Sequence, residues 1–149
     1  MQIRPATTKD VSAIVALLAN DKLGRLREDY RDPLPNSYLQ AFERIASDSN
    51  QHLVVLEDKG QLIGTLQLTF IPYLTYQGGV RAQIEAVRIH SDYRGQGLGE
   101  KLFRWAIDQA ATEGAHVVQL TTDKKRPEAV RFYEKLGFVA SHEGMKLHL

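Results

Sequence analysis

The chain has 149 residues, with 19 Lys and Arg against 18 Asp and Glu, and its length predicts a single domain, residues 1–149, with a hydrophobic core of its own. The formal charge of +1 excludes the broad basic surface that nucleic-acid binding requires. No Cys is present, which excludes disulfides, thiolate metal sites and a Cys nucleophile.

The sequence offers no segment for a membrane or for export. Its first residues lack an apolar signal region, and the longest apolar stretch, residues 13–19, is too short to span a bilayer. No internal repeat, low-complexity run or linker divides the chain. We therefore expect a cytoplasmic protein that does not associate with membranes.

A strand is expected at residues 2–5, followed by a helix that starts near Thr7. Thr7 and Asp10 have the spacing of a capping box, in which two side chains satisfy free N–H groups at a helix start. Asn20 marks the predicted end of this helix. Its apolar face consists of residues at helical spacing: Val11, Ile14, Val15 and Leu18.

The next segment, residues 21–36, is polar and charged, and two prolines interrupt it. A second helix is predicted from residue 37 to residue 47, with an apolar face of Leu39, Phe42 and Ile45. We expect the polar segment before this helix to border the substrate site.

Three strands are predicted in the middle of the chain, at residues 52–57, 61–71 and 81–89. A tight turn joins the first two, and a glycine-containing loop joins the last two. Consecutive strands on short connections favour an antiparallel meander.

The second half of the chain alternates helices and strands. A helix is predicted at residues 97–114, and a strand at 116–122 is expected to run parallel to the strand at 81–89 through a right-handed crossover. Residues 127–137 have the Pro start and the Gly end that are typical of a helix. Residues 138–148 are expected to supply one or two final strands.

Residues 94–99, Arg-Gly-Gln-Gly-Leu-Gly, form a glycine-rich loop between a predicted strand and an amphipathic helix. The three glycines remove side chains that would keep a phosphate away from the main chain, and the helix directs free N–H groups and its positive dipole end at the anion. This order of parts predicts a pyrophosphate site, with a cation at its rim. Its residues are Arg94, Gly95, Gln96, Gly97, Leu98, Gly99 and Glu100.

The spacing within this loop separates it from two other nucleotide-binding motifs. A dinucleotide fingerprint requires G-x-G-x-x-G, and a P-loop requires Gly-Lys-Ser/Thr where this sequence has Gly99, Glu100 and Lys101. Arg94-x-x-Gly97-x-Gly99 instead resembles the Q/R-x-x-G-x-G/A loop that grips the pyrophosphate of acetyl-coenzyme A in the GCN5-related N-acetyltransferase (GNAT) superfamily. A glycine-rich helix start without a ligand is the alternative for the loop taken alone.

A second segment, residues 126–138, resembles the A-x-x-F-Y-x-x-x-G-F signature of the same superfamily. Residues 121–126 and 141–144 also look like members that acetylate small amines, aminoalkylphosphonates among them. The resemblance covers most of the chain. It implies an α/β domain whose mixed, mostly antiparallel sheet splays between the strands at 81–89 and 116–122, with helices on both faces.

In the family that the sequence resembles, the pantetheine arm of acetyl-coenzyme A lies between the two splayed strands and pairs with main-chain groups. Val87, Arg88 and Ile89 occupy the matching positions. Tyr133 follows Phe132 in the second motif, where the family's tyrosine lies near the sulfur and protonates the departing coenzyme A. A phenol suits this task because it is a neutral donor at pH 7. The alternative is that Tyr133 is a core aromatic residue.

Glu85 is the candidate base that takes the proton from the amine. On a strand of period two, Glu85 shares a face with Val87 and Ile89, near the floor of the cleft. Some relatives carry their catalytic glutamate at the position of Gln83, which is not an acid here. A glutamate that is solvated or paired with a neighbouring arginine is the alternative, and His90 is a further candidate base.

Basic residues elsewhere carry weaker hypotheses. Residues 124–126 are placed to meet the 3′-phosphate of coenzyme A, for which Arg126 is the candidate, or an anionic substrate, although such a run is more often a solvated loop. Arg25, Arg27 and Tyr30 are candidates for binding an acidic group on the acceptor, with ordinary surface charge as the preferred interpretation.

The resemblance implies an enzyme that moves an acetyl group from acetyl-coenzyme A to a primary amine of a small molecule, by direct attack in a ternary complex. A longer or acidic acyl group, a protein N-terminus or lysine as acceptor, and a non-catalytic coenzyme A-binding module are the alternatives. His142 and Glu143 offer only two ligands, so no metal is expected. Nucleic acid is not an expected partner, and a homodimer is left open.

Overall fold

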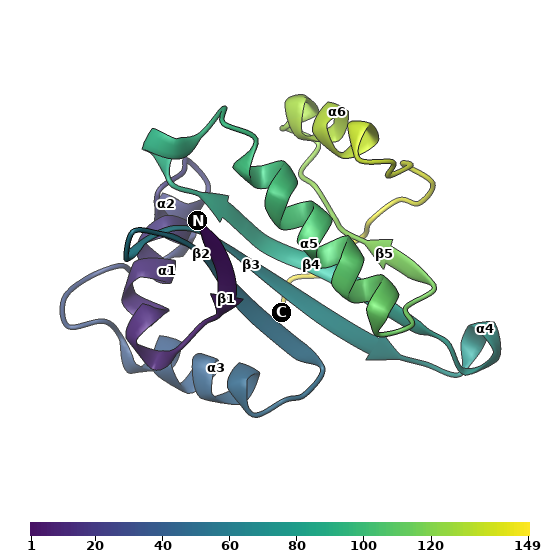
Figure 1. Cartoon of the computed structure of the whole chain (residues 1–149), viewed down its shortest axis with the longest axis horizontal. Helices are drawn as coiled ribbons and strands as arrows, with labels where there is room; N and C mark the ends of the chain where they lie inside the picture. The colour runs from purple at the N-terminus through teal and green to yellow at the C-terminus, as the bar shows by residue number, and fades with distance from the viewer.

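A five-stranded sheet forms the centre of the computed structural model, which describes all 149 residues (Figure 1). The strands lie in the order β1 (Gln2–Pro5), β2 (Gln51–Asp58), β3 (Gln61–Pro72), β4 (Val80–Ile89) and β5 (Val117–Gln119). The first four strands run antiparallel to their neighbours, and β5 runs parallel to β4. The mixed, mostly antiparallel sheet predicted from the sequence is confirmed.

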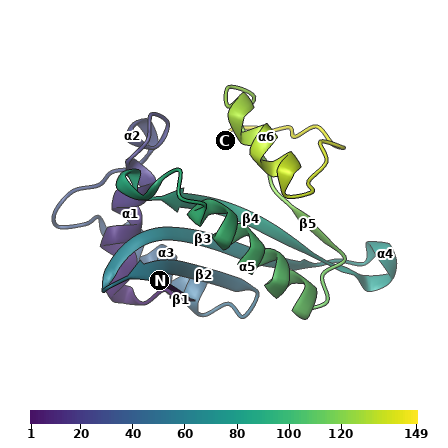
Figure 2. The ribbon, with the colours of Figure 1, turned by 45° about the horizontal axis from the view of Figure 1, so that its top comes forward.

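Helices cover both faces of the sheet, as expected. The helical segments are η1 (Thr8–Asp10), α1 (Val11–Ala19), α2 (Gly24–Arg27), α3 (Asn36–Ala46), α4 (Thr75–Gly78), η2 (Ser91–Tyr93), α5 (Leu98–Thr112) and α6 (Pro127–Lys135). α5 lies against one face, α1 and α3 lie on the other, and α6 stands beside β5 (Figure 1 and Figure 2). None of these helices combines the length and the apolar character that crossing a bilayer would need.

The larger hydrophobic core lies between α5 and the sheet. The face that α5 buries repeats at helical spacing: Leu98, Leu102, Phe103, Ala106 and Ala110. The fully buried side chains of β2 and β3 include Leu56, Ile63, Leu66 and Leu68. Each such side chain contributes roughly 1.5–3 kcal/mol by leaving water. This burial fixes α5 on the sheet, and it thereby fixes the loop from which α5 starts.

A smaller core joins α1 and α3 on the opposite face, through Val11, Val15 and Phe42. The face predicted for α1 is correct except at its end, where Leu17 is buried and Leu18 is only partly buried. The two leucines follow the preceding buried isoleucine by three and four residues. Both spacings lie on one helical face, so tertiary packing decides between them.

β4 and β5 separate after three paired positions. β5 pairs with residues 81–83 of β4, and β4 then continues alone to Ile89. The strand predicted at 116–122 is correct in its direction but is shorter than expected. Residues 84–89 have no partner on this side, so the sheet is open there, and the predicted splay is confirmed.

A bulge at Ala86 changes which residues of β4 share a face. Gln67 of β3 lies opposite Glu85, but Thr65, only two residues away, lies opposite Arg88. β4 therefore holds one extra residue between these pairs, and Ala86 takes a φ of 55°, in the left-handed region. As a result, Glu85 and Arg88 lie on the same face of the sheet.

The expectation that Glu85 shares a face with Val87 and Ile89 is wrong, because it assumes an unbroken period of two. Val87 and Ile89 pack against the core beneath α5. Glu85 lies on the opposite face, with Arg88. Alanine gives no signal for such a bulge, since the left-handed region is typical of Gly, Asn and Asp.

The final strands expected at residues 138–148 are not formed. This segment contains no strand or helix and passes behind β5 in Figure 1. Phe138 packs against the core, but three other large apolar side chains of the segment are exposed: Val139, Met145 and Leu147. A strand needs a partner for its N–H and C=O groups, and this segment pairs with no strand of the chain. In the polar segment 21–36, by contrast, one short helix that was not predicted is present, α2.

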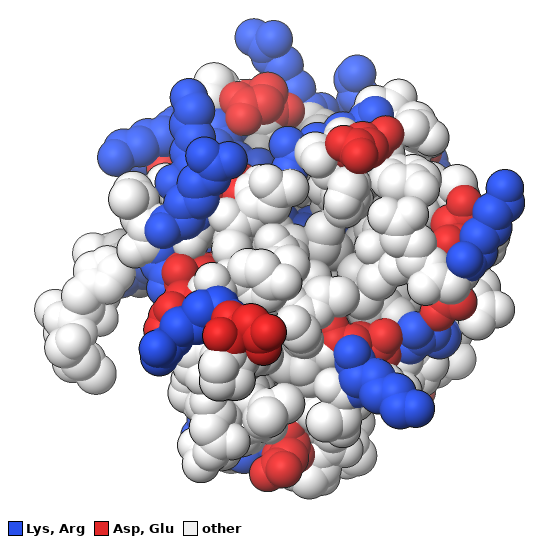
Figure 3. Space-filling view, turned by 90° about the vertical axis from the view of Figure 1, so that its left-hand side faces the viewer, with Lys and Arg blue, Asp and Glu red and all other residues white.

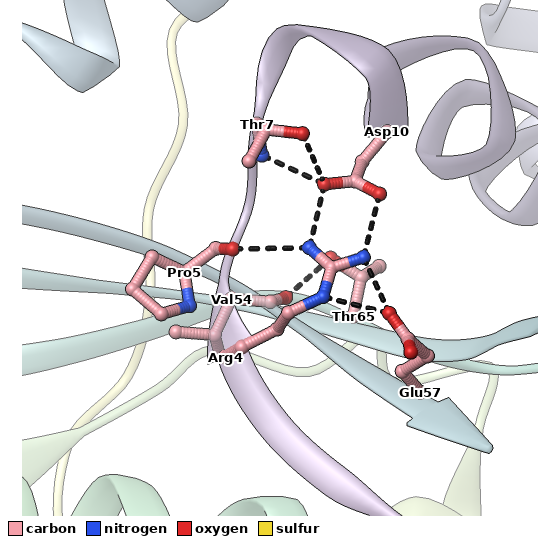
Figure 4. A network of polar contacts seen from close by, with 7 residues as sticks. All are labelled: Arg4, Pro5, Thr7, Asp10, Val54, Glu57 and Thr65. Carbon is pink, nitrogen blue, oxygen red and sulfur yellow. Dashed lines mark hydrogen bonds and ion pairs between the residues drawn. The ribbon is translucent and has the colours of Figure 1, made fainter. Parts of the chain in front are cut away.

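Arg4 joins β1 to the first helical turn and to β2 (Figure 4). Its guanidinium donates to both carboxylate oxygens of Asp10, at 2.8 and 3.0 Å, and its Nε donates to Glu57 at 2.7 Å. Asp10 also accepts from the N–H and the hydroxyl of Thr7, and the predicted capping box is confirmed. The hydrogen bonds from Arg4 are the largest cause that lowers the pKa of Asp10, to about 2.

Asp10→Asn is expected to lower the free energy of unfolding by about 2 kcal/mol at pH 7. The folded-state pKa of Asp10 lies below its ordinary value of 3.8, so the carboxylate stabilises the fold above that value, and the stabilisation is lost as the pH falls toward 2. Urea unfolding should show a difference between the two proteins that shrinks by about half at pH 3. Equal differences at pH 7 and pH 3 would contradict this role.

Candidate active site

The glycine-rich loop leads into the first turn of α5. Gly95 and Gly97 take positive φ angles of 74° and 76°, and Gly97 caps the helix. The N–H of Lys101 donates to the C=O of Gly97 at 3.1 Å. The N–H groups of residues 98–100 precede this bond and have no acceptor within the helix. They lie at the positive end of α5, where a phosphate is bound most favourably.

The loop leaves its main chain open to a ligand. No atom lies within 4 Å of the position that a Cβ would take at Gly95 or Gly97. At Gly99 a Cβ would meet the ring of Phe132 at 3.7 Å, which is ordinary contact. α6 therefore packs beside the loop without filling the space over Gly95 and Gly97.

Arg94 ties the loop to two other elements. Its Nε donates to the C=O of Ile89 at 3.2 Å, and its Nη2 donates to the C=O of Asn20 at 3.4 Å. The end of β4, the end of α1 and the loop thus meet at one guanidinium. Its Nη1 group has no acceptor within the chain, so it is available to a phosphate.

The main chain of β4 offers hydrogen-bonding groups to the opening beside β5. The C=O of Val87 accepts from Arg88 Nη1 at 2.9 Å, and the C=O of Ile89 accepts from Arg94. Because these carbonyls bond to side chains and not to β3, the main-chain groups of Val87 and Ile89 point into the opening. An extended ligand can pair with them as an added strand does.

Tyr133 stands on α6 in an aromatic cluster formed by α5, α6 and the segment that follows α6. Its ring centroid lies 5.4 Å from that of Phe103 and 6.2 Å from that of Phe138. Burial raises the pKa of Tyr133, and the charges of Arg126 and Arg88 oppose this only in part. The phenol is therefore neutral at pH 7 and retains a proton that it can donate.

Glu85 is exposed on the unpaired part of β4 and forms no ion pair within the chain. The pairing with a neighbouring arginine, given above as an alternative, is not formed. His90 caps the η2 turn, with its Nδ1 accepting from the N–H of Asp92 at 3.3 Å, as a turn residue does. Gln119 of β5 donates to Gln83 of β4 at 2.7 Å and ties the two strands together just before they separate.

A charged cluster lies on the same face of the sheet as Glu85. Asp21 Oδ2 lies 3.0 Å from Arg88 Nε, and Asp21 Oδ1 accepts from the N–H of Gly24 at 2.5 Å. A Cβ at Gly24 would lie 1.9 Å from the C=O of Leu18, so α2 packs this close to α1 only because the residue is glycine. Nothing singled out Asp21 in the sequence except its spacing of three residues before a glycine at a helical turn.

The charges in this cluster act on one another. Burial opposes ionisation of Asp21, but main-chain N–H groups and the charges of Arg88 and Arg126 outweigh it, so the pKa of Asp21 is lowered. Burial also lowers the pKa of Arg88, as do the charges of Arg27 and Arg126, while two carboxylates raise it. Arg27 and Arg126 therefore lie close enough to Arg88 for their charges to be felt.

The remaining residues singled out in the sequence are at the surface. Arg25 and Tyr30 are exposed. His142 contacts the hydroxyl of Ser141 at 2.8 Å in the exposed C-terminal segment. No cluster of three or more His, Cys, Asp or Glu side chains is arranged to hold a metal ion.

Comparison with known proteins gives the family. Residues 21–138 match the acetyltransferase (GNAT) family, a match that covers most of the chain and includes the glycine-rich loop and Tyr133. The chain belongs to the GNAT family of acetyltransferases. It is an acyl-coenzyme A-dependent acetyltransferase with the fold that the resemblance implied.

Three similar proteins are informative. Aminoalkylphosphonate N-acetyltransferase of Salmonella typhimurium is 28% identical over 141 residues, which cover 95% of this chain and 86% of that protein. A solved protein described as a transcriptional regulator from Bacillus halodurans C-125 is 55% identical, with a TM-score of 0.96 over 99% of both chains. A predicted acetyltransferase from Clostridium acetobutylicum, solved with acetyl-coenzyme A, is 21% identical, with a TM-score of 0.76 over 99% of this chain and 95% of that one.

Gly97→Asp is expected to weaken acetyl-coenzyme A binding by at least about tenfold, because a carboxylate then faces the pyrophosphate among N–H donors. The fold should persist, since the site has room for a Cβ and Asp tolerates a positive φ. Gly97→Asn has nearly the same size without the charge and should bind more tightly than Gly97→Asp. Calorimetry with acetyl-coenzyme A measures all three affinities.

Gly60→Asp is the matched control. Gly60 has a φ of 82° and equally open surroundings, but it lies in the β2–β3 turn. This variant carries the same backbone strain and should bind acetyl-coenzyme A as the parent does. Unchanged affinity in a folded Gly97→Asp variant would remove residues 94–100 from the binding site.

Proposed function

We propose that the enzyme transfers the acetyl group of acetyl-coenzyme A to a primary amine of a small molecule, by direct attack in a ternary complex. The observation that carries this proposal is the opening between β4 and β5. The glycine-rich loop follows the end of β4, Glu85 lies on the unpaired part of that strand, and α6 brings Tyr133 close enough for the charge of Arg88 to act on it. Two reactants held in one opening need no covalent enzyme intermediate.

The cosubstrate is proposed to bind along this opening. Residues 94–100 would hold its pyrophosphate, supported by the free N–H groups at the start of α5 and by the open space over the loop. The main chain of residues 87–89 would pair with the pantetheine arm, supported by the direction of its carbonyls. Arg126, which caps α6 at its start, would meet the 3′-phosphate.

The proposed reaction is an acyl transfer with two proton movements. The amine nitrogen attacks the thioester carbonyl carbon, a C–N bond forms, and the C–S bond to coenzyme A breaks. Tyr133 gives its phenolic proton to the departing sulfur. Glu85, directly or through a water molecule, takes the proton that the amine nitrogen loses. The raised pKa of Tyr133 and the exposed, unpaired carboxylate of Glu85 support these assignments.

Tyr133→Phe is expected to lower kcat about 100-fold or more while acetyl-coenzyme A affinity changes little, because the ring and its aromatic contacts remain and only the proton is lost. Tyr73→Phe, which removes a hydroxyl near the β3–β4 connection, is the matched control and should retain kcat. Steady-state release of coenzyme A measures both. Wild-type turnover in Tyr133→Phe would make Tyr133 a structural residue.

Glu85→Gln is expected to lower the rate most near pH 7 and much less near pH 10, where more of the acceptor arrives as the free amine and needs no base. Glu113→Gln, an exposed change at the end of α5, is the control for loss of one surface charge. The measurement is a pH–rate profile of each variant. A Glu85→Gln profile parallel to that of the parent would leave His90 or an ordered water as the base.

Small-amine acceptors are supported by the similarity to the Salmonella aminoalkylphosphonate N-acetyltransferase. A screen of amines, peptides and acyl donors for thiol release tests this choice. Release with small amines and acetyl-coenzyme A is the expected result. Release only with peptides, or only with longer or acidic acyl groups, would replace the acceptor or donor proposed here. Tight acetyl-coenzyme A binding without release from any acceptor would indicate a non-catalytic binding module.

We also propose a cytoplasmic enzyme that works as a homodimer. The use of acetyl-coenzyme A supports the location. The exposed apolar side chains of the segment at 138–148, which has a strand-like sequence but no strand partner, support an interface with a second copy.

A further inference from the structure

Arg4 and Arg88 are both largely buried, but their N–H groups are satisfied to different degrees. Arg4, with 28% of its side chain exposed, donates to Asp10, Glu57 and a main-chain carbonyl. Arg88 has 16% of its side chain exposed and makes a single hydrogen bond, to the C=O of Val87. The more deeply buried arginine is therefore the less satisfied one.

The Nε of Arg88 is buried without a hydrogen-bond partner. Asp21 Oδ2 lies 3.0 Å away and neutralises charge, but its position is not aligned with the N–H bond. Asp21 is itself held by the N–H of Gly24. A buried N–H group in this state costs free energy, which the ion pair with Asp21 offsets in part.

Arg81 is the other arginine with a buried, unpartnered Nε, and it has an explanation within the chain. Its guanidinium lies over the ring of Tyr73, 4.5 Å from the centroid, in a cation–π contact. Arg88 has no aromatic partner of this kind. Its Nη2 group makes no hydrogen bond within the chain and, unlike its Nε, is not an enclosed atom, so it is available to a ligand.

The bulge places Arg88 on the same face as Glu85, away from α5. The two residues lie opposite β3 residues that are two apart, Thr65 and Gln67, so about 7 Å of strand separates them. The pyrophosphate site is at the start of α5, on the other face. Arg88 thus lies on the same face as the proposed base.

Charges of both signs act on Arg88: those of Arg27 and Arg126, and those of the carboxylates Asp21 and Glu28. Figure 3 views the side of the molecule on which α1 and α2 lie, and Lys and Arg side chains cluster in its upper left part with fewer Asp and Glu among them. Arg27 of α2 is close enough to act on Arg88.

We propose that Arg88, assisted by Arg27, binds an anionic oxygen group on the acceptor, a carboxylate, phosphate or phosphonate. The inference rests on the proposed acetyl transfer and names the substrate class: short amines with an anionic end. Asp21 is the positioning residue that holds the guanidinium in place. The Nη2 group of Arg88 supplies charge-assisted N–H donors to such an anion.

Three amines test the proposal: 4-aminobutyrate and 3-aminopropylphosphonate carry an anionic end, and butylamine does not. The parent enzyme should show kcat/KM at least tenfold higher for the anionic amines. In Arg88→Met the ratio of kcat/KM for the anionic amines to kcat/KM for butylamine should fall toward one, mainly because KM for the anionic amines rises. Arg88→Lys keeps the charge but not the guanidinium, so its preference for anionic amines should lie between that of the parent and that of Arg88→Met. If the Met variant does not fold, Arg88→Lys replaces it in the test. The comparison of the two anions identifies the preferred head group.

Neighbouring α2 residues provide matched controls. Arg27→Gln should reduce the preference about threefold, because that residue acts at longer range than Arg88. Arg25→Gln, on the same short helix, should leave it unchanged. A preference that stays the same in Arg88→Met, or one that Arg25→Gln lowers as much as Arg88→Met does, would overturn the assignment.

A binding measurement separates this inference from the proposed function. Methylphosphonate has no amine to acetylate. Calorimetry should show that, with acetyl-coenzyme A present in both cases, methylphosphonate binds the parent enzyme at least tenfold more tightly than it binds Arg88→Met. Absence of turnover with every amine would count against the acetyl transfer but not against this site. Equal methylphosphonate binding, or a loss of acetyl-coenzyme A affinity in Arg88→Met, would show that Arg88 does not bind the anion of an acceptor.

Discussion

The bulge at Ala86 determines what the rest of β4 can do. One extra residue sends the side chains of Val87 and Ile89 into the core beneath α5 and leaves Arg88 on the opposite face with Glu85. A left-handed conformation costs an alanine roughly 1–2 kcal/mol, so the packing on both faces must hold it in place. Local strain in β4 thus places core side chains on one face of the strand and the charged side chains of Glu85 and Arg88 on the other.

Other elements of the site are arranged around this strand by simple physical causes. The apolar face of α5 fixes its start against the sheet, and the free N–H groups there favour a phosphate. α6 brings Tyr133 to the side of α5 through contacts with Phe103. On the opposite face, Gly24 lets α2 approach α1, which holds Asp21 beside Arg88. The glycine-rich loop and α5 therefore lie on one face of the open sheet, and Asp21, Glu85 and Arg88 lie on the other.

The sequence predicted those parts whose chemistry is local. The glycine-rich loop, the helix that follows it and the capping box at Thr7 are each encoded by residues within a few positions of one another, and all three are present. The order of strands also followed from short connections. These features need no knowledge of distant contacts.

The features that the sequence did not predict depend on partners far along the chain. The bulge arises in an ordinary alanine, the choice of Leu17 over Leu18 is made by packing, and the segment at 138–148 has a strand pattern without a strand to pair with. Asp21 acquires its role only when α2 folds against α1. The face of Glu85 was predicted wrongly for the same kind of reason, because an unbroken strand was assumed.

Joint binding of coenzyme A by the loop and by the open edge of β4 is tested most directly by NMR, with the backbone amides followed as coenzyme A is added. The amides of Val87, Ile89 and residues 95–100 should shift together with a single Kd, and the Val87 and Ile89 amides should exchange more slowly with solvent once they pair with the ligand. Shifts confined to the loop, with Val87 and Ile89 unchanged in position and exchange rate, would contradict a role for the open strand edge in binding.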